Sequence, residues 1–239
     1  MYKAIIFDLD NTLLDYDRCE LDAMQRTCKD YGLFVDQPDA WESFWHVYRG
    51  NSFKYWTDFV NGGETKSIHE VLRYAFRDSL APTDIAHDAL GAAYWAYFCK
   101  VIHWEDGAEQ LLADLRGRFD LGLITNGISE SQRKRLLAGG IHAMFRSIII
   151  SDEVNCRKPQ QEIFELALRE LDAKPREVLF VGDSLEDDYQ GALRSGVDFC
   201  YYNKHGKPMP AAVRPRYAIR SLEELTGRIL NTEREVAAE

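Results

Sequence analysis

The chain opens with a short apolar run that ends in two carboxylates, Ala4-Ile5-Ile6-Phe7-Asp8-Leu9-Asp10-Asn11-Thr12. Four apolar residues without polar alternation are typical of a strand buried on both faces, as in a parallel sheet. Asp8 and Asp10 are two residues apart, so they point the same way if the chain stays extended. In open α/β sheets, ligands bind at the carboxyl ends of the strands. The segment therefore predicts a fold class and a site, although a solvated strand end followed by a turn also explains it.

Further apolar runs of the same kind occur later in the chain, with helical patterns between them. The predicted strands after the first are Leu121–Ile124, Ile148–Ile150, Val178–Val181 and Phe199–Tyr202. Alternation of strands and helices predicts an α/β fold, a Rossmann-like parallel sheet with helices on both faces. A last helix is expected from Ser221 to about Leu230, because Ser221 and Glu224 form a capping-box pattern.

The stretch between the first and second predicted strands contains helical patterns only. It predicts an all-helical domain of residues 15–104 inserted into an α/β core of residues 1–14 and 105–239. Aromatic residues gather in one part of this insertion, at helical spacing: Phe53, Tyr55, Trp56 and Phe59. We expect them to form the core of the helical domain, and a surface that stacks on a ligand is the alternative.

The chain has 239 residues, of which 46% are hydrophobic and 28% are charged. This is the composition of a globular protein that can bury a core without disulfide or metal cross-links. The chain has 29 Lys and Arg against 39 Asp and Glu, a net charge of −10, which disfavours a nucleic acid polymer as partner. The 5 cysteines form no C-x-x-C pair, which indicates a reducing, cytoplasmic location. No apolar run is long enough to span a membrane. We expect a monomer or homodimer without a membrane partner.

Polar groups follow the second predicted strand and the third. Thr125, Asn126 and Gly127 offer a hydroxyl, an amide and a flexible backbone, which suit an oxyanion, and an ordinary turn explains them equally well. Lys158 precedes Pro159 and a predicted helix, so its ammonium could be directed at the same strand ends, although a lone lysine is usually solvated.

The fourth predicted strand ends in Gly182-Asp183-Ser184-Leu185-Glu186-Asp187-Asp188. Its acidic residues would repel one another unless a cation were bound, and Mg²⁺ is a hard cation that prefers carboxylate oxygens. Capping of the next helix by Asp183 and Ser184 is the alternative, and it accounts for one or two of the acidic residues.

Taken in order, these segments resemble the motifs of the haloacid dehalogenase-like (HAD) hydrolase superfamily. The motifs are D-x-D-x-T, Thr-Asn-Gly, Lys-Pro and Gly-Asp-Ser-x-x-x-Asp, and the resemblance extends from Ala4 to about Leu225. The helical insertion resembles the type 1 cap of that superfamily. Thr125-Asn126-Gly127 followed by Gln132 and Arg135 resembles its nucleotidase-related branch, which includes pyrimidine 5′-nucleotidases.

The resemblance implies a mechanism and a role for each matching residue. Asp8 would be the nucleophile that forms an aspartyl-phosphate, and Asp10 would be the general acid and base. Mg²⁺ would be held by the Asp8 side chain, the Asp10 backbone carbonyl and Asp183. The remaining implied roles are phosphate binding by Thr125, Asn126 and Lys158, and orientation of a metal-bound water or of Lys158 by Asp188. One departure is Asp187, where many relatives have Asn.

The resulting prediction is a Mg²⁺-dependent phosphomonoester hydrolase for a small phosphorylated metabolite, with a nucleoside 5′-monophosphate preferred. A sugar-phosphate phosphatase or a phosphomutase could use the same core. A non-catalytic HAD-like protein that binds a ligand or partner is the alternative from another class. The second carboxylate, Asp10, argues against a dehalogenase, because a halide leaving group needs no proton.

Overall fold

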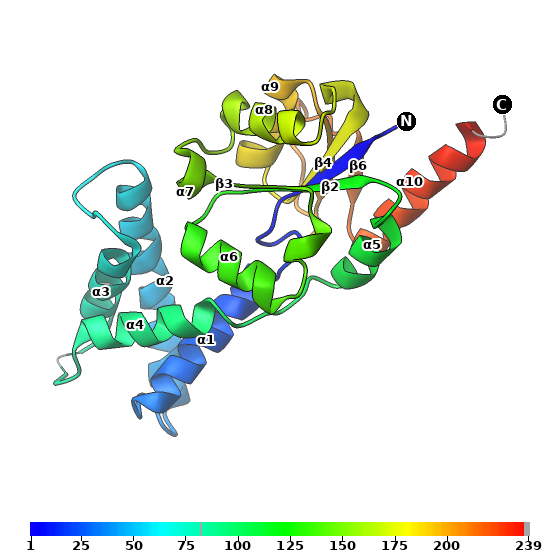
Figure 1. Ribbon diagram of the computed structural model, residues 1–239. Helices are drawn as coiled ribbons and strands as arrows, with labels where there is room; N and C mark the ends of the chain where they lie inside the picture. Colours follow the sequence, from blue (N-terminus) through cyan, green and yellow to red (C-terminus); the bar gives the residue numbers. More distant parts are fainter. Residues whose placement is uncertain (82, 237–239) are drawn as a thin grey trace. The chain divides into compact units, whose positions relative to one another are not determined.

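The computed structural model describes residues 1–81 and 83–236, with side chains as far as residue 229. The chain divides into two compact units, one of Met1–Arg18 with Ile102–Glu239 and the other of Cys19–Val101. The first unit contains a β-sheet and the second consists of helices (Figure 1).

The sheet of the first unit has six strands, and every hydrogen-bonded pair of neighbours is parallel. The strands are β1 (Ala4–Phe7), β2 (Asp120–Thr125), β3 (Ser147–Ile150), β4 (Val178–Gly182), β5 (Asp198–Tyr202) and β6 (Tyr217–Ile219), in the spatial order β3-β2-β1-β4-β5-β6. The chain first fills the side of β2 and β3, and then the side of β4, β5 and β6. The strand order thus reverses between β1 and β4, which is where ligands bind in such sheets. The predicted parallel α/β fold is confirmed.

Both faces of the sheet are covered by helices, because the side chains of each strand alternate between two apolar cores. Ile5 and Phe7 belong to a core that includes leucines of α5 (Ala108–Leu115) and α10 (Leu222–Val236). Ala4 and Ile6 belong to the opposite core, with side chains of α8 (Gln161–Glu170) and α9 (Gln190–Ser195). Burial on both faces explains why β1 shows no polar alternation.

Short helical elements complete this unit: α6 (Ser129–Ala138), α7 (Ser151–Val154), η1 (His142–Met144), η2 (Pro175–Glu177) and η3 (Leu185–Tyr189). The strand β6 was not predicted, because its three residues lie beside charged residues and form no apolar run. The prediction that the last helix ends near Leu230 was wrong, since α10 continues to Val236. Glu224 accepts hydrogen bonds from the backbone N–H groups of Arg220 and Ser221 at the start of this helix.

The helical unit is built around aromatic side chains. Its helices are α1 (Tyr16–Asp30), which begins in the first unit, α2 (Pro38–Val60), α3 (Ile68–Ser79) and α4 (His87–Phe98). The rings of Tyr48 on α2 and Phe76 on α3 lie 4.9 Å apart, and Tyr94 on α4 lies 6.1 Å from Tyr48. The expectation that Phe53, Tyr55, Trp56 and Phe59 form the core was wrong, since Phe53 is 72% exposed and the other three are only partly buried.

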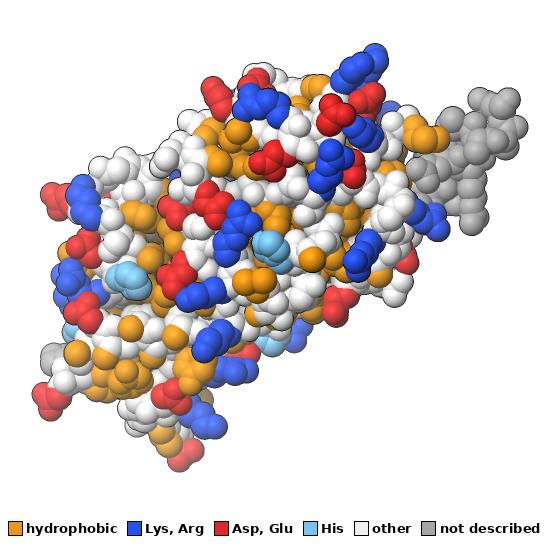
Figure 2. Space-filling model, viewed as in Figure 1, with side chains coloured by type: hydrophobic (Ala, Val, Ile, Leu, Met, Phe, Trp, Pro, Cys, Tyr) orange, Lys and Arg blue, Asp and Glu red, His pale blue; other side chains and the backbone are white. Residues whose placement is uncertain are grey.

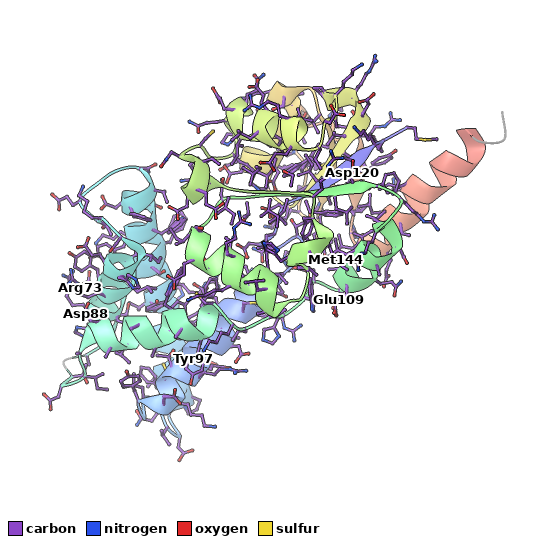
Figure 3. The ribbon with its side chains drawn as sticks, viewed as in Figure 1. Arg73, Asp88, Tyr97, Glu109, Asp120 and Met144 are labelled. Atoms are coloured by element: carbon purple, nitrogen blue, oxygen red, sulfur yellow. The ribbon has the colours of Figure 1, made fainter. Side chains whose placement is uncertain are left out.

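Charged side chains of both signs are scattered over the visible face, among hydrophobic and uncharged ones (Figure 2). One ion pair joins Arg73 of α3 to Asp88 of α4 at 3.8 Å, and both residues are labelled in Figure 3. Among the described residues, none of the helices combines the length and apolar character needed to cross a lipid bilayer.

The two chain segments that connect the units run side by side in the first unit. Leu14 and Trp104 form an antiparallel bridge, and the Asp15 N–H donates to the His103 carbonyl at 2.8 Å. Beside this bridge, the buried carboxylate of Glu105 accepts hydrogen bonds from the Lys204 ammonium and, at 3.1 Å, from the Tyr202 hydroxyl. Burial raises the pKa of Glu105, and the hydrogen bond and charge of Lys204 oppose this rise. Lys204 therefore stabilises a carboxylate that would otherwise be buried without a counterion.

Replacing that counterion should destabilise the fold. Lys204→Met leaves Glu105 buried and unpaired, which we expect to lower the free energy of unfolding by about 3 kcal/mol. Urea denaturation at pH 7 measures this difference. The matched control is Lys207→Met at an exposed position of the same loop, where the change should stay within about 0.5 kcal/mol. Equal effects of the two substitutions would contradict a stabilising role for the pair.

Candidate active site

The reversal of strand order places two carboxylates together. Asp8 follows β1 and Asp183 follows β4, and these strands are hydrogen-bonded neighbours in the sheet. The Asp8 N–H donates to the Val181 carbonyl at 2.9 Å and so extends the pairing of the two strands by one residue. The predicted site at the carboxyl edge of the sheet thus has its first two members on adjacent strands.

A buried lysine lies between two buried carboxylates at this edge. The Lys158 Nζ is 2.5 Å from Asp8 Oδ1 and 2.7 Å from Asp188 Oδ1. The Lys158 side chain is 2% exposed, and Asp8 and Asp188 are also buried. The lysine is therefore a counterion for two carboxylates and is not the solvated charge that a lone lysine usually is.

Hydrogen bonds to backbone groups hold Lys158 and Asp188 in place. The Asn126 Oδ1 accepts a hydrogen bond from the Lys158 N–H at 2.9 Å, and the Asn126 Nδ2 donates to the Lys158 carbonyl at 3.0 Å. The Ser184 N–H donates to Asp188 Oδ2 at 3.0 Å. A Cβ at Gly182 would lie 2.2 Å from that same oxygen, so only glycine fits there. The amide of Asn126, which was predicted to bind phosphate, thus holds the backbone of Lys158 in this structure.

The carboxyl groups have perturbed pKa values because they are buried close together. Burial raises the pKa of Asp8 to about 7, where the charge of Lys158 opposes the rise and that of Asp188 adds to it. Burial and the charges of Asp8 and Asp188 raise the pKa of Asp183 to about 8. For Lys158, burial favours the neutral amine, but the charges of Asp188 and Asp8 outweigh it and raise the pKa of the ammonium above its ordinary value. Perturbed groups of this kind cluster at functional sites.

Three carboxylates at this edge suit a divalent cation. Asp8, Asp183 and Asp188 each offer one oxygen, and these atoms lie within 4.8 Å of one another. When all three are ionised, they carry three negative charges against the single positive charge of Lys158, an excess that a bound cation would balance. Carboxylate oxygens are the ligands of a hard cation such as Mg²⁺. The chemistry of this donor set fits the predicted metal, and it brings Asp188 beside the predicted ligands Asp8 and Asp183.

The side chain of Asp10 contacts the helix α6 instead of this cluster. Its Oδ1 accepts a hydrogen bond from Arg135 Nη1 at 2.6 Å, and its Oδ2 accepts one from Gln132 Nε2 at 2.9 Å. The same Gln132 amide donates to the hydroxyl oxygen of the buried Thr125 at 2.8 Å. Thr125 and Asp10 are thus connected through one side chain, although they follow different strands.

Gln132 and Arg135 matched the family pattern in the sequence but had no predicted role in the site. Both lie on the buried face of α6 with Ser131 and Leu136, and polar residues on an otherwise buried helix face were the signal that could have revealed them. Asp187, the departure from the superfamily pattern, is half-buried, and its Oδ2 lies 3.4 Å from Asn126 Nδ2. Burial raises the pKa of Asp187.

Comparisons with known proteins show which family the chain belongs to. The family model for haloacid dehalogenase-like hydrolases matches residues 2–196. The HAD-hydrolase YfnB of Bacillus subtilis is 31% identical over 99% of this chain and 98% of its own. Its magnesium-bound crystal structure superposes with a TM-score of 0.78 at 29% identity, covering 95% of this chain and 98% of that one.

Two relatives named as phosphatases or nucleotidases also match. The pyrimidine 5′-nucleotidase YjjG of Escherichia coli is 30% identical over 92% of this chain and 95% of its own. A glyceraldehyde 3-phosphate phosphatase of Methanopyrus kandleri is 42% identical over 82% of each chain. With the motifs in sequence order, the parallel sheet and a family match over most of its length, the chain belongs to the haloacid dehalogenase-like hydrolases and is an enzyme of their phosphatase group.

Proposed function

We propose that this protein is a Mg²⁺-dependent phosphomonoester hydrolase that forms an aspartyl-phosphate on Asp8, with a nucleoside 5′-monophosphate as its preferred substrate. The observation that carries the proposal is the buried contact of the Asp8 carboxylate with Lys158, beside Asp183 and Asp188 at the carboxyl edge of the sheet. A purely structural ion pair would not need two further carboxylates at the same place.

Asp8 is the group that would attack the substrate. One of its carboxylate oxygens forms a bond to phosphorus while the bond from phosphorus to the leaving oxygen breaks, which gives an acyl phosphate. Lys158 contacts Asp8 and is buried, so its charge opposes the negative charge that gathers on the phosphoryl oxygens in this step. Fixed charge of this kind is worth more in a site that excludes water than in water.

Asp10 would act as the general acid and base. In the first step its carboxyl group donates a proton to the leaving oxygen, and in the second it accepts a proton from the water that hydrolyses the acyl phosphate. The side chain of Asp10 is 23% exposed, which leaves it open to a leaving group or to water. Thr125 supplies a hydroxyl for a phosphoryl oxygen at the end of the neighbouring strand.

The metal would be held by Asp8, Asp183 and the Asp10 backbone carbonyl, with Asp188 oriented by Lys158 and the Ser184 N–H. Bound Mg²⁺ would offset the excess negative charge and polarise a phosphoryl oxygen. The magnesium-bound structure of a relative that covers 95% of this chain supports this assignment.

Support for a nucleotide substrate comes from the relative named as a pyrimidine 5′-nucleotidase, which matches this chain over 92% of its length. The Thr125-Asn126-Gly127 motif followed by Gln132 and Arg135 agrees with it. A sugar phosphate is the second candidate, since the relative from M. kandleri named as a glyceraldehyde 3-phosphate phosphatase is 42% identical.

A substrate panel tests the proposal. Phosphate release is measured with nucleoside 5′-monophosphates, glyceraldehyde 3-phosphate, other sugar phosphates and p-nitrophenyl phosphate, each with Mg²⁺ and with excess EDTA. We expect turnover that EDTA abolishes and Mg²⁺ restores, with the nucleoside 5′-monophosphates hydrolysed fastest. Preference for sugar phosphates would select the second candidate. Folded protein that releases no phosphate from any member would contradict the proposal.

Removal of the nucleophile should abolish turnover and leave the fold intact. Asp8→Asn is expected to lower kcat by at least about 10³-fold, because the amide cannot form the acyl phosphate. Steady-state kinetics measures the loss, and circular dichroism confirms folding. The control is Asp120→Asn at the opposite end of a neighbouring strand, where Asp120 pairs with Arg146; this variant should keep kcat. Activity of Asp8→Asn near that of the parent would remove Asp8 from the mechanism.

A further inference from the structure

The helix α6 presents two buried polar side chains to Asp10, and the proposed mechanism does not use them. Arg135 is 0% exposed, and Gln132 is nearly as buried. Each contacts a different oxygen of the Asp10 carboxylate, at 2.6 Å for Arg135 Nη1 and 2.9 Å for Gln132 Nε2. The carboxylate is therefore restrained at both oxygens, which fixes its rotation about the bond to Cβ.

Arg135 also fixes the orientation of the Gln132 amide. Its Nη1 donates to Gln132 Oε1 at 3.1 Å, so the NH₂ end of the amide faces Asp10 and Thr125. A reversed amide would place its oxygen against the carboxylate of Asp10 and its NH₂ group against the guanidinium, and both contacts are repulsive. The three side chains therefore define one arrangement of donors and acceptors.

A structural role alone does not require this arrangement. A buried helix face is stabilised most simply by apolar side chains, as Leu136 shows on the same face. Burying a guanidinium is costly unless a carboxylate is nearby, and the carboxylate here belongs to Asp10. The partners of Arg135 and Gln132 are thus a residue proposed to transfer protons and a residue proposed to bind phosphate.

We propose that Arg135 and Gln132 are positioning residues that hold the Asp10 carboxyl in the orientation required for proton transfer to the leaving oxygen. Gln132 in addition couples that orientation to the hydroxyl of Thr125. This inference rests on the proposed function, in which Asp10 is the general acid. No new bond is made to either residue; the proton passes from Asp10 to the leaving oxygen as the bond to phosphorus breaks.

Substrates with different leaving groups distinguish a residue that positions the general acid from one that only stabilises the fold. An alkyl phosphomonoester, such as a nucleoside 5′-monophosphate, expels an alkoxide that must be protonated, whereas p-nitrophenolate is stable without a proton. Loss of a well-placed general acid typically lowers the rate of the chemical step by ~10²- to 10⁴-fold, and only for substrates whose leaving group must be protonated. Displacement of the Asp10 carboxyl should therefore lower the rate with the alkyl substrate and leave the rate with the aryl substrate nearly unchanged.

The experiment measures leaving-group release in the first turnover with Mg²⁺, because hydrolysis of the acyl phosphate is common to all substrates. The substrates are p-nitrophenyl phosphate and the alkyl phosphomonoester that the wild-type protein hydrolyses fastest. We expect Gln132→Met and Arg135→Met to slow the alkyl substrate at least about tenfold more than the aryl substrate. Arg135→Lys, which keeps the charge, should recover part of the loss.

Two comparisons make the result specific. Lys134→Met, on the same helix with a side chain that is 53% exposed, should change neither rate. Circular dichroism and thermal unfolding show whether each variant is folded, and Gln132→Glu supplies a second replacement of nearly equal size should Gln132→Met fail to fold. The ionised carboxylate that Gln132→Glu introduces cannot donate the hydrogen bond that the Gln132 amide gives to Asp10 Oδ2, so this variant should also slow the alkyl substrate selectively.

Equal loss on both substrates in folded variants, or no loss on either, would overturn the positioning role and leave the proposed function standing. A wild-type protein that is inactive on both substrates would instead overturn the proposed function and this inference with it.

Discussion

The ammonium group of Lys158, held between the carboxylates of Asp8 and Asp188, is the interaction on which the candidate active site depends. A buried carboxylate is strongly destabilised unless an opposite charge lies beside it, and here one lysine serves two. Because this pairing is buried, the loop that carries Lys158 must be placed accurately. The Asn126 side chain does this by bonding both the N–H and the carbonyl of Lys158.

The parallel sheet explains how residues far apart in sequence reach one place. β1 and β4 supply Asp8 and Asp183 because the strand order reverses between them. β2, on the other side of β1, supplies Thr125 and Asn126. Apolar cores on both faces fix the register of the strands. The positions of the polar groups at the strand ends are therefore also fixed. The helix after β2 then adds Gln132 and Arg135 on the side of Asp10.

The sequence predicted those parts of the structure that depend on local patterns. Apolar runs marked the strands β1 to β5 to within about a residue, because strands buried on both faces cannot alternate. Polar residues at the strand ends marked the site, and the order of the motifs identified the family. The three residues of β6 escaped prediction because so short a strand is defined by its pairing with β5.

Contacts between side chains could not be predicted in the same way. Asn126 bonds the backbone of Lys158 because two loops lie close together in space, and no spacing in the sequence encodes that distance. The partners of Asp10 lie 122 and 125 positions away along the chain. Phe53 is a case in which a local pattern gave a wrong prediction. Its helical spacing predicted burial, but the helices pack so that its ring is exposed.

An Asp8 that acts as the nucleophile becomes covalently phosphorylated during turnover, and chemical trapping detects that acyl phosphate. The enzyme is mixed with Mg²⁺ and its best substrate, quenched in acid within the first turnovers, reduced with borohydride and digested for peptide mass spectrometry. Borohydride reduces an acyl phosphate to an alcohol and leaves a free carboxylate unchanged. We expect homoserine at position 8 only when substrate was present. Active enzyme whose Asp8 is unmodified, or whose reduction falls on another carboxylate, would contradict it.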